Sequence, residues 1–528
     1  MDEAPEGRPR SGQLTAVAIL LAASVLLSRV LGYLRDAVLA WRIGASVEAD
    51  AYFAAFMLPD LLNHFLAGGA LTIAFIPFYT KVRSGSGQEA AERFLSVILG
   101  TLGALTVLVT VLLWVCADAL VALQFPRFTP EAQALTARLT RILLPAQIFF
   151  VMGGVIRGAL MAHGRFATQA LAPILYNLGI IVGGVALGGL MGAEGFAWGA
   201  LAGAVVGPFL APLLEAARAG EPRIRLRVAP FDRAFLRYLV LALPLILGVS
   251  LLTVDEWYDR WFGALFAPGT VAHLTYARRL MLLPVGIVGQ AIATAALPLL
   301  SHLWSEGRRE EMNRTLLETL RVGLGLALFA TGAFFVFADP LVTLLYERGR
   351  FAAEDTVRVV ALLRIFAFAI PAWIVQQIAV RSFYARGDTW RPMLLATGIA
   401  APAAALYWLL GIRYGPRGLA AAGVIGMSAS ALATLLLAKR LHGSPPLRPL
   451  FSALLRTTGA TVFAAFVAQV GALWLPLPSS GAVGALILLA GGGALYALAA
   501  FAALHVAGDP PLRAAVQRVL RSGRRTGA

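Results

Sequence analysis

Long apolar runs recur along this chain from its first hydrophobic stretch to its last. Each run is about 20 residues or longer, which is enough for a helix to cross a hydrocarbon core of about 30 Å. The 528 residues are 59% hydrophobic and only 14% charged, with a mean hydropathy of +0.77. The runs lack the apolar-polar alternation of a lipid-facing barrel. We therefore predict an all-α integral membrane protein, because in lipid a helix satisfies its own backbone hydrogen bonds.

The pattern predicts about 14 transmembrane helices with both termini in the cytoplasm. Lys and Arg concentrate in the loops that a cytoplasmic N-terminus would place inside, as the positive-inside rule requires. The net charge of +16 is spread over short clusters between apolar runs, which is typical of a topogenic signal and does not indicate nucleic-acid binding. The single cysteine, Cys116, excludes a disulfide framework and is expected to be a small buried hydrophobe. The predicted spans are roughly 14–41, 49–80, 93–122, 131–162, 168–190, 194–216, 236–264, 270–303, 314–337, 356–385, 390–411, 418–438, 450–474 and 483–506.

The second half of the chain repeats the first. The segment MLPDLLNHFLAGGALTIAFIPFYTKVRSG resembles LLPVGIVGQAIATAALPLLSHLWSEG, and CADALVALQF resembles FADPLVTLLYERGRF. Pro77 with Pro298 and Asp118 with Asp339 keep the same offset. Because an even number of spans separates the copies, we predict two parallel six-helix lobes followed by two extra helices. The expected parts are a cytoplasmic tail (1–13), the N-terminal lobe (14–222), the C-terminal lobe (223–445), two extra transmembrane helices (446–507) and a basic cytoplasmic tail (508–528).

Charged residues lie inside the first apolar run, in the sequence SRVLGYLRDAV, at Arg29, Arg35 and Asp36. A central Arg or Asp costs roughly 3 kcal/mol on the insertion scale, whereas a Leu, Ile or Val returns only about 0.5. A helix that carries three such charges is expected to face a watery or protein-lined cavity. The alternative is that Arg35 and Asp36 lie at an interface and snorkel. Helical spacing places Arg29 and Asp36 on one face and Arg35 on another.

The second span adds polar residues that the same cavity would explain. Asp50 comes first, and Asp60, Asn63 and His64 follow at i, i+3 and i+4, so those three share a face. Pro59 is expected to kink this helix just before them.

If the lobes are equivalent, the seventh and eighth spans should carry charges toward the same space. They do, at Asp255, Glu256, Asp259, Arg260, Arg278 and Arg279. Asp255 and Asp259 share a face and form a candidate ion-coupling site. Glu256 and Arg260 have ion-pair spacing, so they either neutralise each other or belong to that site.

Further arginines come from the fourth span and its repeat mate, the tenth, and a chamber rich in guanidinium suits a large anion, particularly phosphate. These arginines are Arg138, Arg141, Arg157, Arg358, Arg364 and Arg381.

Several enzyme classes have no support in the sequence. The six histidines are dispersed without metal-ligand spacing, and we find no Walker loop, nucleophile elbow or H-E-x-x-H helix. The glycine-rich run GGVALGGLMG lies inside a predicted span, where close helix packing explains it better than phosphate binding. We therefore expect no catalytic residue, no metal and no cofactor other than a coupling cation.

The stretch SRVLGYLRDAVLAWRIGASVEADAYFAAFMLPDLL resembles the opening of the MurJ/MviN lipid II flippases, a branch of the multidrug/oligosaccharidyl-lipid/polysaccharide exporter superfamily. The resemblance continues through HGRFATQALAPILYN, LTYARRLMLLPVGIVGQAIATAALPLLS, LYERGRFAAEDT and RSFYARGDTWRP. It covers almost the whole chain, in order and at family-like spacing. It implies 14 helices in all, arranged as two lobes and a C-terminal pair that helps to form a hydrophobic groove.

The resemblance also implies roles for individual residues. Arg29, Arg35 and Asp50 match charged positions of the family's first two helices, and Arg279 matches the arginine of its Tyr-Ala-Asp-Arg-Leu motif. These positions are implied to line the cavity that receives the pyrophosphate and sugar-peptide head group of lipid II.

The chain departs from the family pattern at several positions. Asn63 and Gly68 stand where charged residues are common, Arg278 replaces the usual Asp, and Gln377 replaces a basic residue found in some members. These departures bear on which lipid is carried.

Together these observations predict a flippase that moves lipid II, an undecaprenyl-diphosphate-linked precursor, from the inner to the outer leaflet of a bacterial cytoplasmic membrane by alternating access. Coupling would come from Na⁺, H⁺ or the membrane potential. The alternatives are a flippase for another undecaprenyl-linked saccharide, a cation-coupled drug exporter of the same superfamily and, with less support, a polyprenyl-dependent glycosyltransferase or a scaffold. The predicted external loops are short for a glycosyltransferase, and a scaffold gives no reason for charges inside spans.

Overall fold

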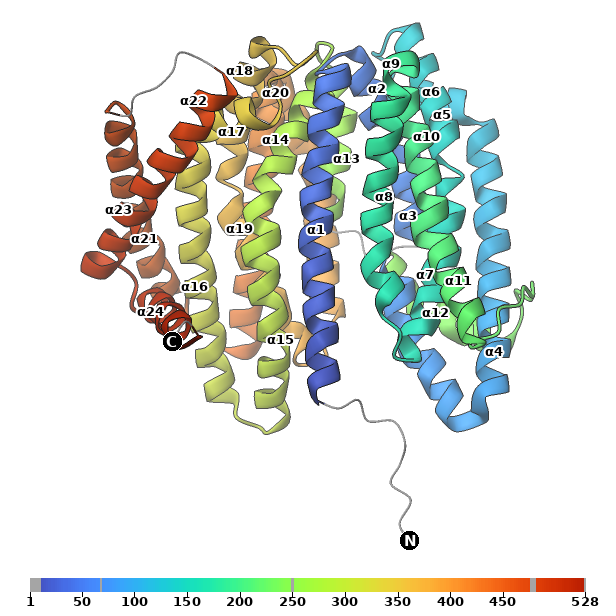
Figure 1. The fold of residues 1–528 in the computed structure, drawn as a ribbon. Coiled ribbons are helices and arrows are strands. Elements are labelled where there is room, and N and C mark those ends of the chain that lie inside the picture. Colours follow the sequence, from blue (N-terminus) through green and yellow to red (C-terminus); the bar gives the residue numbers. More distant parts are fainter. Residues whose placement is uncertain (1–10, 67–68, 248–250, 475–480, 527–528) are drawn as a thin grey trace. The chain divides into compact units, whose positions relative to one another are not determined.

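The structure, a computed structural model, describes residues 11–66, 69–247, 251–474 and 481–526. The regular secondary structure of these residues is entirely helical. Two compact units divide the chain, Met1–Leu247 and Gly248–Ala528. Figure 1 shows the helices of both units coloured along the chain.

The first unit contains twelve α-helices and one π-helical turn among its described residues. In chain order they are α1 (Ser11–Ile43), α2 (Val47–Ala55), α3 (Met57–Leu66), α4 (Gly69–Val115), α5 (Ala117–Gln124), α6 (Pro130–Leu143), α7 (Ala146–Ala162), α8 (Ala167–Ala186), α9 (Gly188–Met191), α10 (Ala193–Ala204), η1 (Val205–Leu210), α11 (Ala211–Ala219) and α12 (Arg233–Leu247).

The second unit contains a further twelve α-helices and two π-helical turns in the part that the structure describes. They are α13 (Leu251–Gly263), α14 (Thr270–Pro284), η2 (Val285–Gly289), α15 (Gln290–Ser305), α16 (Arg309–Val336), α17 (Ala338–Leu345), α18 (Ala353–Ala367), α19 (Ile370–Tyr384), α20 (Trp390–His442), α21 (Leu447–Ala472), α22 (Ala482–Ile487), η3 (Leu488–Gly492), α23 (Gly493–Ala507) and α24 (Pro510–Thr526).

The all-helical membrane fold predicted from the sequence is confirmed. Within the described residues, nine helical segments are long and apolar enough to span a membrane, or ten if a pair bent by 41°, α18 with α19, counts as one span. The count of 14 stays a prediction. Two long helices are each two helices joined at a glycine, because Gly87 in α4 (φ 85°) and Gly415 in α20 (φ 62°) take a left-handed conformation that interrupts the helix.

The internal repeat appears as a repeated order of helices. In the first unit the eight-residue α5 is followed by α6 and α7, and in the second the eight-residue α17 is followed by α18 and α19. Asp118 and Asp339 each lie in the first turn of the short helix. The predicted boundary between lobes, after residue 222, stays a prediction. The compact units divide after Leu247, inside the predicted seventh span.

The second predicted span is interrupted. Its residues form α2, α3 and the start of α4, and the break between α2 and α3 lies at Phe56. Pro59 lies in the first turn of α3, where a proline costs no helix hydrogen bond. The expected kink at Pro59 is thus a break of the helix three residues earlier.

The prediction that Cys116 is buried is wrong: this residue is exposed, at the junction of α4 and α5.

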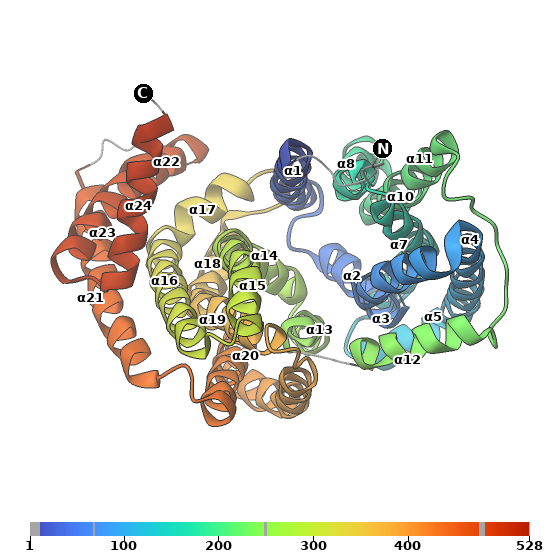
Figure 2. The same ribbon diagram turned by 90° about the horizontal axis from the view of Figure 1, so that it is seen from below.

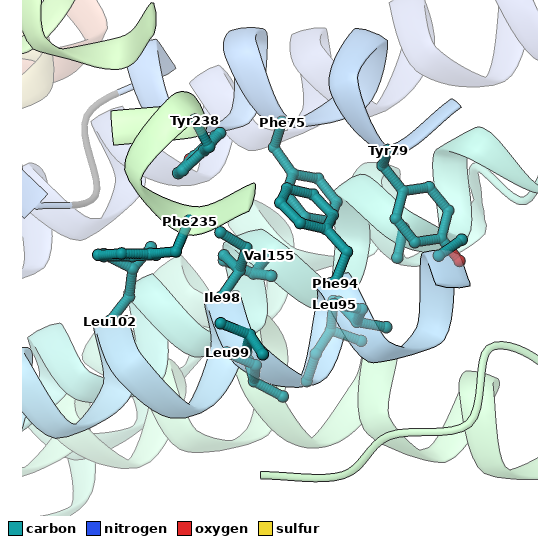
Figure 3. Close-up of a cluster of buried hydrophobic side chains, with 14 of the residues drawn as sticks. Phe75, Tyr79, Phe94, Leu95, Ile98, Leu99, Leu102, Val155, Phe235 and Tyr238 are labelled. Atoms are coloured by element: carbon teal, nitrogen blue, oxygen red, sulfur yellow. The ribbon is translucent and has the colours of Figure 1, made fainter. Parts of the chain in front are cut away.

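A cluster of buried apolar side chains packs α4, α7 and α12 together in the first unit (Figure 3), and its aromatic rings come from α4 and α12. The rings of Phe75 and Phe94, both on α4, stack with centroids 5.8 Å apart. Tyr238 of α12 meets the Phe75 ring edge-on at 6.4 Å. Offset and edge-on arrangements are those that aromatic rings prefer.

Glycines hold α8 and α10 in close contact, as the sequence predicts for its glycine-rich run. A Cβ atom on Gly183 would lie 2.5 Å from the carbonyl oxygen of Gly195, and one on Gly199 would lie 2.5 Å from that of Gly179. The two backbones approach too closely for any side chain at these positions.

The C-terminal helices of the second unit pack beside α16 (Figure 2). Small residues of α21, Ala464 and Ala468, meet α23 around Tyr496, whose hydroxyl donates to the carbonyl of Phe329 at 2.7 Å. Just before α24, the buried Asp509 accepts two hydrogen bonds from Arg321 of α16, at 2.5 and 3.1 Å.

Candidate functional site

The charges of α1 are ordered by one another and by α8. Arg35 donates from Nε and Nη2 to Oδ1 of Asp36, at 3.0 and 2.8 Å. Its Nη1 donates to Oδ1 of Asn177 at 3.2 Å. Asp36 is buried at 3% exposure, whereas Arg29 is half-buried. Arg35 was expected to point away from Asp36, but its long side chain turns toward it.

Asn177 is held by its own hydrogen bonds. Its Nδ2 donates to the carbonyl of Pro173 at 3.0 Å, and it reaches the carbonyl and hydroxyl oxygens of Ser28, each at 3.3 Å. The amide oxygen is thereby aimed at Arg35. Asn177 lies 142 positions from Arg35, so spacing along the chain could not predict the contact. Its one sequence signal is its place at the end of the family-like segment HGRFATQALAPILYN.

The polar residues of α2 and α3 lie in two environments. Asp50 on α2 is buried. On α3, Leu58 and Leu62 are buried against Leu144. Helical geometry places Asp60, Asn63 and His64 on the opposite face, and all three are half-buried. Gly68 lies outside the described residues.

A buried ionic cluster occupies the second unit, between α13, α14 and α20. Arg278 of α14 donates from Nε to Oδ2 of Asp259 at 2.5 Å and from Nη1 to Asp255. Asp255 also accepts from the hydroxyl of Tyr407, on α20. The four side chains are between 0% and 3% exposed. The guanidinium lies over the ring of Phe366 on α18, 4.5 Å from its centroid.

The sequence predicted part of this cluster. Asp255 and Asp259 share a face of α13, as their spacing indicates, and the expected Glu256–Arg260 pair is present at 3.5 Å. Arg278, predicted to bind substrate, is instead buried between two carboxylates, whereas Arg279 is half-buried. Tyr407 was missed, because it lies 152 positions from Asp255 in a run of apolar residues.

A small cavity opens beside the cluster. Its volume is about 10 Å³, and it is lined by Glu256, Asp259, Arg260, Thr275, Arg278 and Arg279. This is about the space of one water molecule. In the described part of the chain, no group of three or more His, Cys, Asp and Glu side chains is placed to hold a metal ion.

The arginines of the fourth and tenth predicted spans contact groups of their own unit. Arg141 binds both oxygens of Asp118, at 2.6 and 3.0 Å, and Arg157 donates to the carbonyl of Pro208 at 2.7 Å. The others are Arg138, 3.5 Å from Glu194; Arg358, 2.5 Å from Glu354; Arg364, 3.3 Å from the carbonyl of Phe335; and Arg381, over the ring of Tyr384.

Many apolar helices in two units, with charged side chains held among them, define a multi-pass helical membrane protein. Residues 39–490 match the family model described as lipid II flippase MurJ. The chain belongs to this family. A relative described as a probable lipid II flippase MurJ, from Rhizobium meliloti (strain 1021), is 30% identical over 467 residues, which cover 86% of each chain.

Solved structures share the fold. One titled lipid II flippase MurJ in an inward closed conformation matches with a TM-score of 0.78 at 23% identity, covering 92% of this chain and 99% of that one. An inward-facing multidrug resistance transporter of the MATE family matches with a TM-score of 0.66 at 18% identity, covering 79% and 94%. An outward-facing one matches at 0.58 and 18% identity, covering 81% and 95%.

Proposed function

We propose that this protein flips lipid II from the inner to the outer leaflet of the bacterial cytoplasmic membrane. The observation that carries the proposal is the match of residues 39–490 to the lipid II flippase family. Ionised side chains inside membrane helices support it, because a bilayer-spanning helix keeps such residues only where they serve a pathway or a partner. Transporters of this fold solved in inward-facing and outward-facing conformations support an alternating-access cycle.

We assign the diphosphate of the substrate to Arg29, Arg35 and Arg279. Guanidinium binds phosphate through two parallel hydrogen bonds and stays charged at any physiological pH. The contact with Asp36 and Asn177 orients Arg35 for this role. Asp50, Asp60, Asn63 and His64 would contact the head group, and Arg278 would act through the buried acids that it binds. The polyprenyl tail stays in lipid.

The membrane potential favours the outward step. Moving one charge across 100 mV is worth about 2.3 kcal/mol, and an inside-negative potential drives an anion outward. Asp255 and Asp259 are the proposed site at which a cation adds to this driving force.

The decisive experiment replaces the resident lipid II flippase of a depletion strain with this protein and measures precursor exposed on the outer leaflet. We expect rescue by the parent protein and none by Arg29→Ala or Arg279→Ala. Arg314→Ala is the matched control. The Arg314 side chain is 80% exposed, and it forms a surface ion pair with Glu318, one helical turn away. Full rescue by both Arg29→Ala and Arg279→Ala would show that the site assignment is wrong.

A second candidate is a flippase for another undecaprenyl-linked saccharide. It is favoured by Asn63 and Arg278, which stand where the family commonly has other charges. Asn63→Arg should be tolerated or improve rescue if lipid II is the substrate. Failure of the correctly inserted parent protein to rescue, together with outer-leaflet exposure of a different undecaprenyl-linked saccharide, would establish this candidate instead.

A further inference from the structure

The last helix of the second unit, α24, has one apolar and one basic face. Leu512, Ala515 and Val516 recur at helical spacing and share a face. Arg521 lies opposite them, with Arg518 beside it, and both arginines are exposed. The helix carries five arginines and no acidic residue. This composition is typical of helices that lie in the interface of a membrane.

The start of α24 lies at the level where α16 changes from charged to apolar. The sequence of α16 is rich in charge up to Arg321, whereas its stretch Val322–Val336 has no charged residue. Arg321 binds the buried Asp509, which directly precedes α24. Leu512 packs against Gly325, where a Cβ would clash with the Leu512 side chain. Because charged residues stay at the water side of a span, these contacts place the start of α24 at the boundary between water and hydrocarbon.

The direction of α24 crosses that of α16 (Figure 1 and Figure 2). Its first turns are also attached to the end of α23. Arg513 donates to the carbonyl of His505 at 3.1 Å, and the Gln517 amide lies 3.4 Å from Nε2 of the same histidine. The apolar pattern of the sequence continues past these contacts, at Val519 and Leu520. A helix held across the spans at this depth has lipid on one side and water on the other.

We propose that α24 lies in the membrane interface and binds anionic phospholipid, with its apolar face on acyl chains and with Arg518 and Arg521 on headgroup phosphates. Guanidinium binds phosphate through two parallel hydrogen bonds, and each arginine near an anionic surface strengthens the attraction. Through Asp509 and Leu512 the bound lipid surface also holds α16. The proposal goes beyond the flippase function and does not depend on which lipid is transported.

A lipid surface matches both faces of α24. A nucleic acid would bind the arginines but leave the apolar face in water. A protein partner on the apolar face would have to enter at the level of the acyl chains. Anionic phospholipid supplies acyl chains for Val516 and phosphates for Arg518 and Arg521 in the same layer.

Spin labels on the full-length protein test how α24 lies. Cys116 is exposed and would be labelled, so the background is Cys116→Ser, with a single label at Val516→Cys or at Ala514→Cys. Ala514 is exposed and lies on the polar face. In vesicles of phosphatidylcholine with one quarter phosphatidylglycerol, we expect the label at 516 to collide mainly with oxygen and the label at 514 mainly with a water-soluble nickel chelate. Nickel contact at both positions would overturn the proposal, and so would a label at 516 shielded from both reagents, because protein would then cover the face.

The preference for anionic lipid is tested with a fluorophore at Ala514→Cys in the same background. The quenchers are phosphatidylglycerol and phosphatidylcholine, each carrying a nitroxide near the headgroup end of an acyl chain. We expect phosphatidylglycerol to quench several-fold more strongly at equal mole fraction, and Arg518→Gln with Arg521→Gln to abolish the difference. Arg309→Gln with Arg314→Gln is the matched control, because it removes the same charge from the exposed start of α16 and should keep the preference. Equal quenching by both lipids in the parent protein, or an unchanged preference in the α24 variant, would contradict the proposal.

Discussion

Arg35 on α1 and Asn177 on α8 are joined by a hydrogen bond of 3.2 Å from Nη1 to Oδ1, although 142 positions separate them. The amide that accepts this bond also donates within its own unit, to Pro173 and Ser28. An arginine proposed to bind diphosphate is therefore held from two sides, by a carboxylate on its own helix and by an amide on another. A site group fixed in this way needs little reorganisation when an anion arrives.

Removing the amide of Asn177 should weaken transport more than folding. A hydrogen bond to a charged group contributes about 1.5–3 kcal/mol, so Asn177→Ala should lower lipid II exposure roughly tenfold or more if Arg35 loses its orientation. The measurement is outer-leaflet precursor in the depletion strain at matched membrane levels. Ser28→Ala removes only an acceptor of Asn177 and should remain near the parent level. Equal activity of Asn177→Ala and the parent protein would remove Asn177 from the site.

The buried pair Arg321–Asp509 should contribute far more stability than an exposed one. Asp509 is fully buried and bidentate with Arg321, so Asp509→Asn should cost about 3–5 kcal/mol by leaving a guanidinium without its partner. Thermal unfolding in detergent measures this as a lower Tm. Glu306→Gln is the comparison, because Glu306 pairs with Arg308 at 2.7 Å on the surface, and its Tm should match the parent. Similar Tm values for both variants would contradict this ranking.

The stability that the surface pair Arg308–Glu306 contributes should decrease as the pH falls. The hydrogen bond from Arg308 lowers the pKa of Glu306. A lowered folded-state pKa gives stability that is present above the unfolded-state pKa and lost as pH falls through the folded-state value. Any difference in Tm between Glu306→Gln and the parent should therefore be largest near neutral pH and vanish in acid. A Tm difference between the two proteins that grows on acidification would show that it does not come from the Arg308–Glu306 pair.

Close packing of α8 on α10 should make its glycines intolerant of alanine. Because a Cβ on Gly183 or Gly199 would meet backbone atoms at 2.5 Å, Gly183→Ala and Gly199→Ala should each cost about 1–3 kcal/mol through overpacking. Gly459→Ala is the control: a Cβ there meets no atom within 4 Å, and alanine favours a helix. We expect a lower Tm for the first two variants and an unchanged or higher Tm for the third.

The segment 221–229, which has no regular secondary structure, should detach from α4 when Gly100 gains a side chain. Arg227 donates its backbone N–H to Ser96 at 3.0 Å, and Ala229 donates to the Thr101 hydroxyl at 3.0 Å. A Cβ on Gly100 would lie 2.5 Å from the backbone of Arg227. Gly100→Ala should therefore speed tryptic cleavage within 221–229 several-fold, whereas Gly85→Ala, with no atom within 4 Å of its Cβ, should not. Unchanged cleavage would mean that α4 does not hold the segment.

Hydropathy and helical spacing predicted the elements of this protein better than the partners of its charges. The membrane helices follow from apolar length, and the shared face of Asp255 and Asp259 follows from a four-residue spacing. The bonds from Tyr407 to Asp255 and from Asn177 to Arg35 join helices distant in the chain. Which helix packs beside which depends on side-chain complementarity, and no local spacing encodes it.

The two adjacent charges of α1, Arg35 and Asp36, illustrate a second reason why helical spacing did not predict the partners of charged residues. Neighbouring helix positions project about 100° apart, so face analysis separates Arg35 from Asp36. The arginine side chain is long enough to cross that angle, and it binds Asp36 at 2.8 Å. Likewise, Arg278 was expected to bind substrate because charge inside a span suggests a cavity, yet two buried acids bind it first.

The glycine contact between α8 and α10 has a mechanical consequence. Backbones that touch directly have no intervening side chains whose rotamers could rearrange under load, so neither helix can slide or roll on the other without a clash. We expect α8 and α10 to move together as one rigid pair during the transport cycle. Asn177 lies on α8, so a displacement of α8 would change the orientation of the Arg35 guanidinium to which Asn177 is hydrogen-bonded.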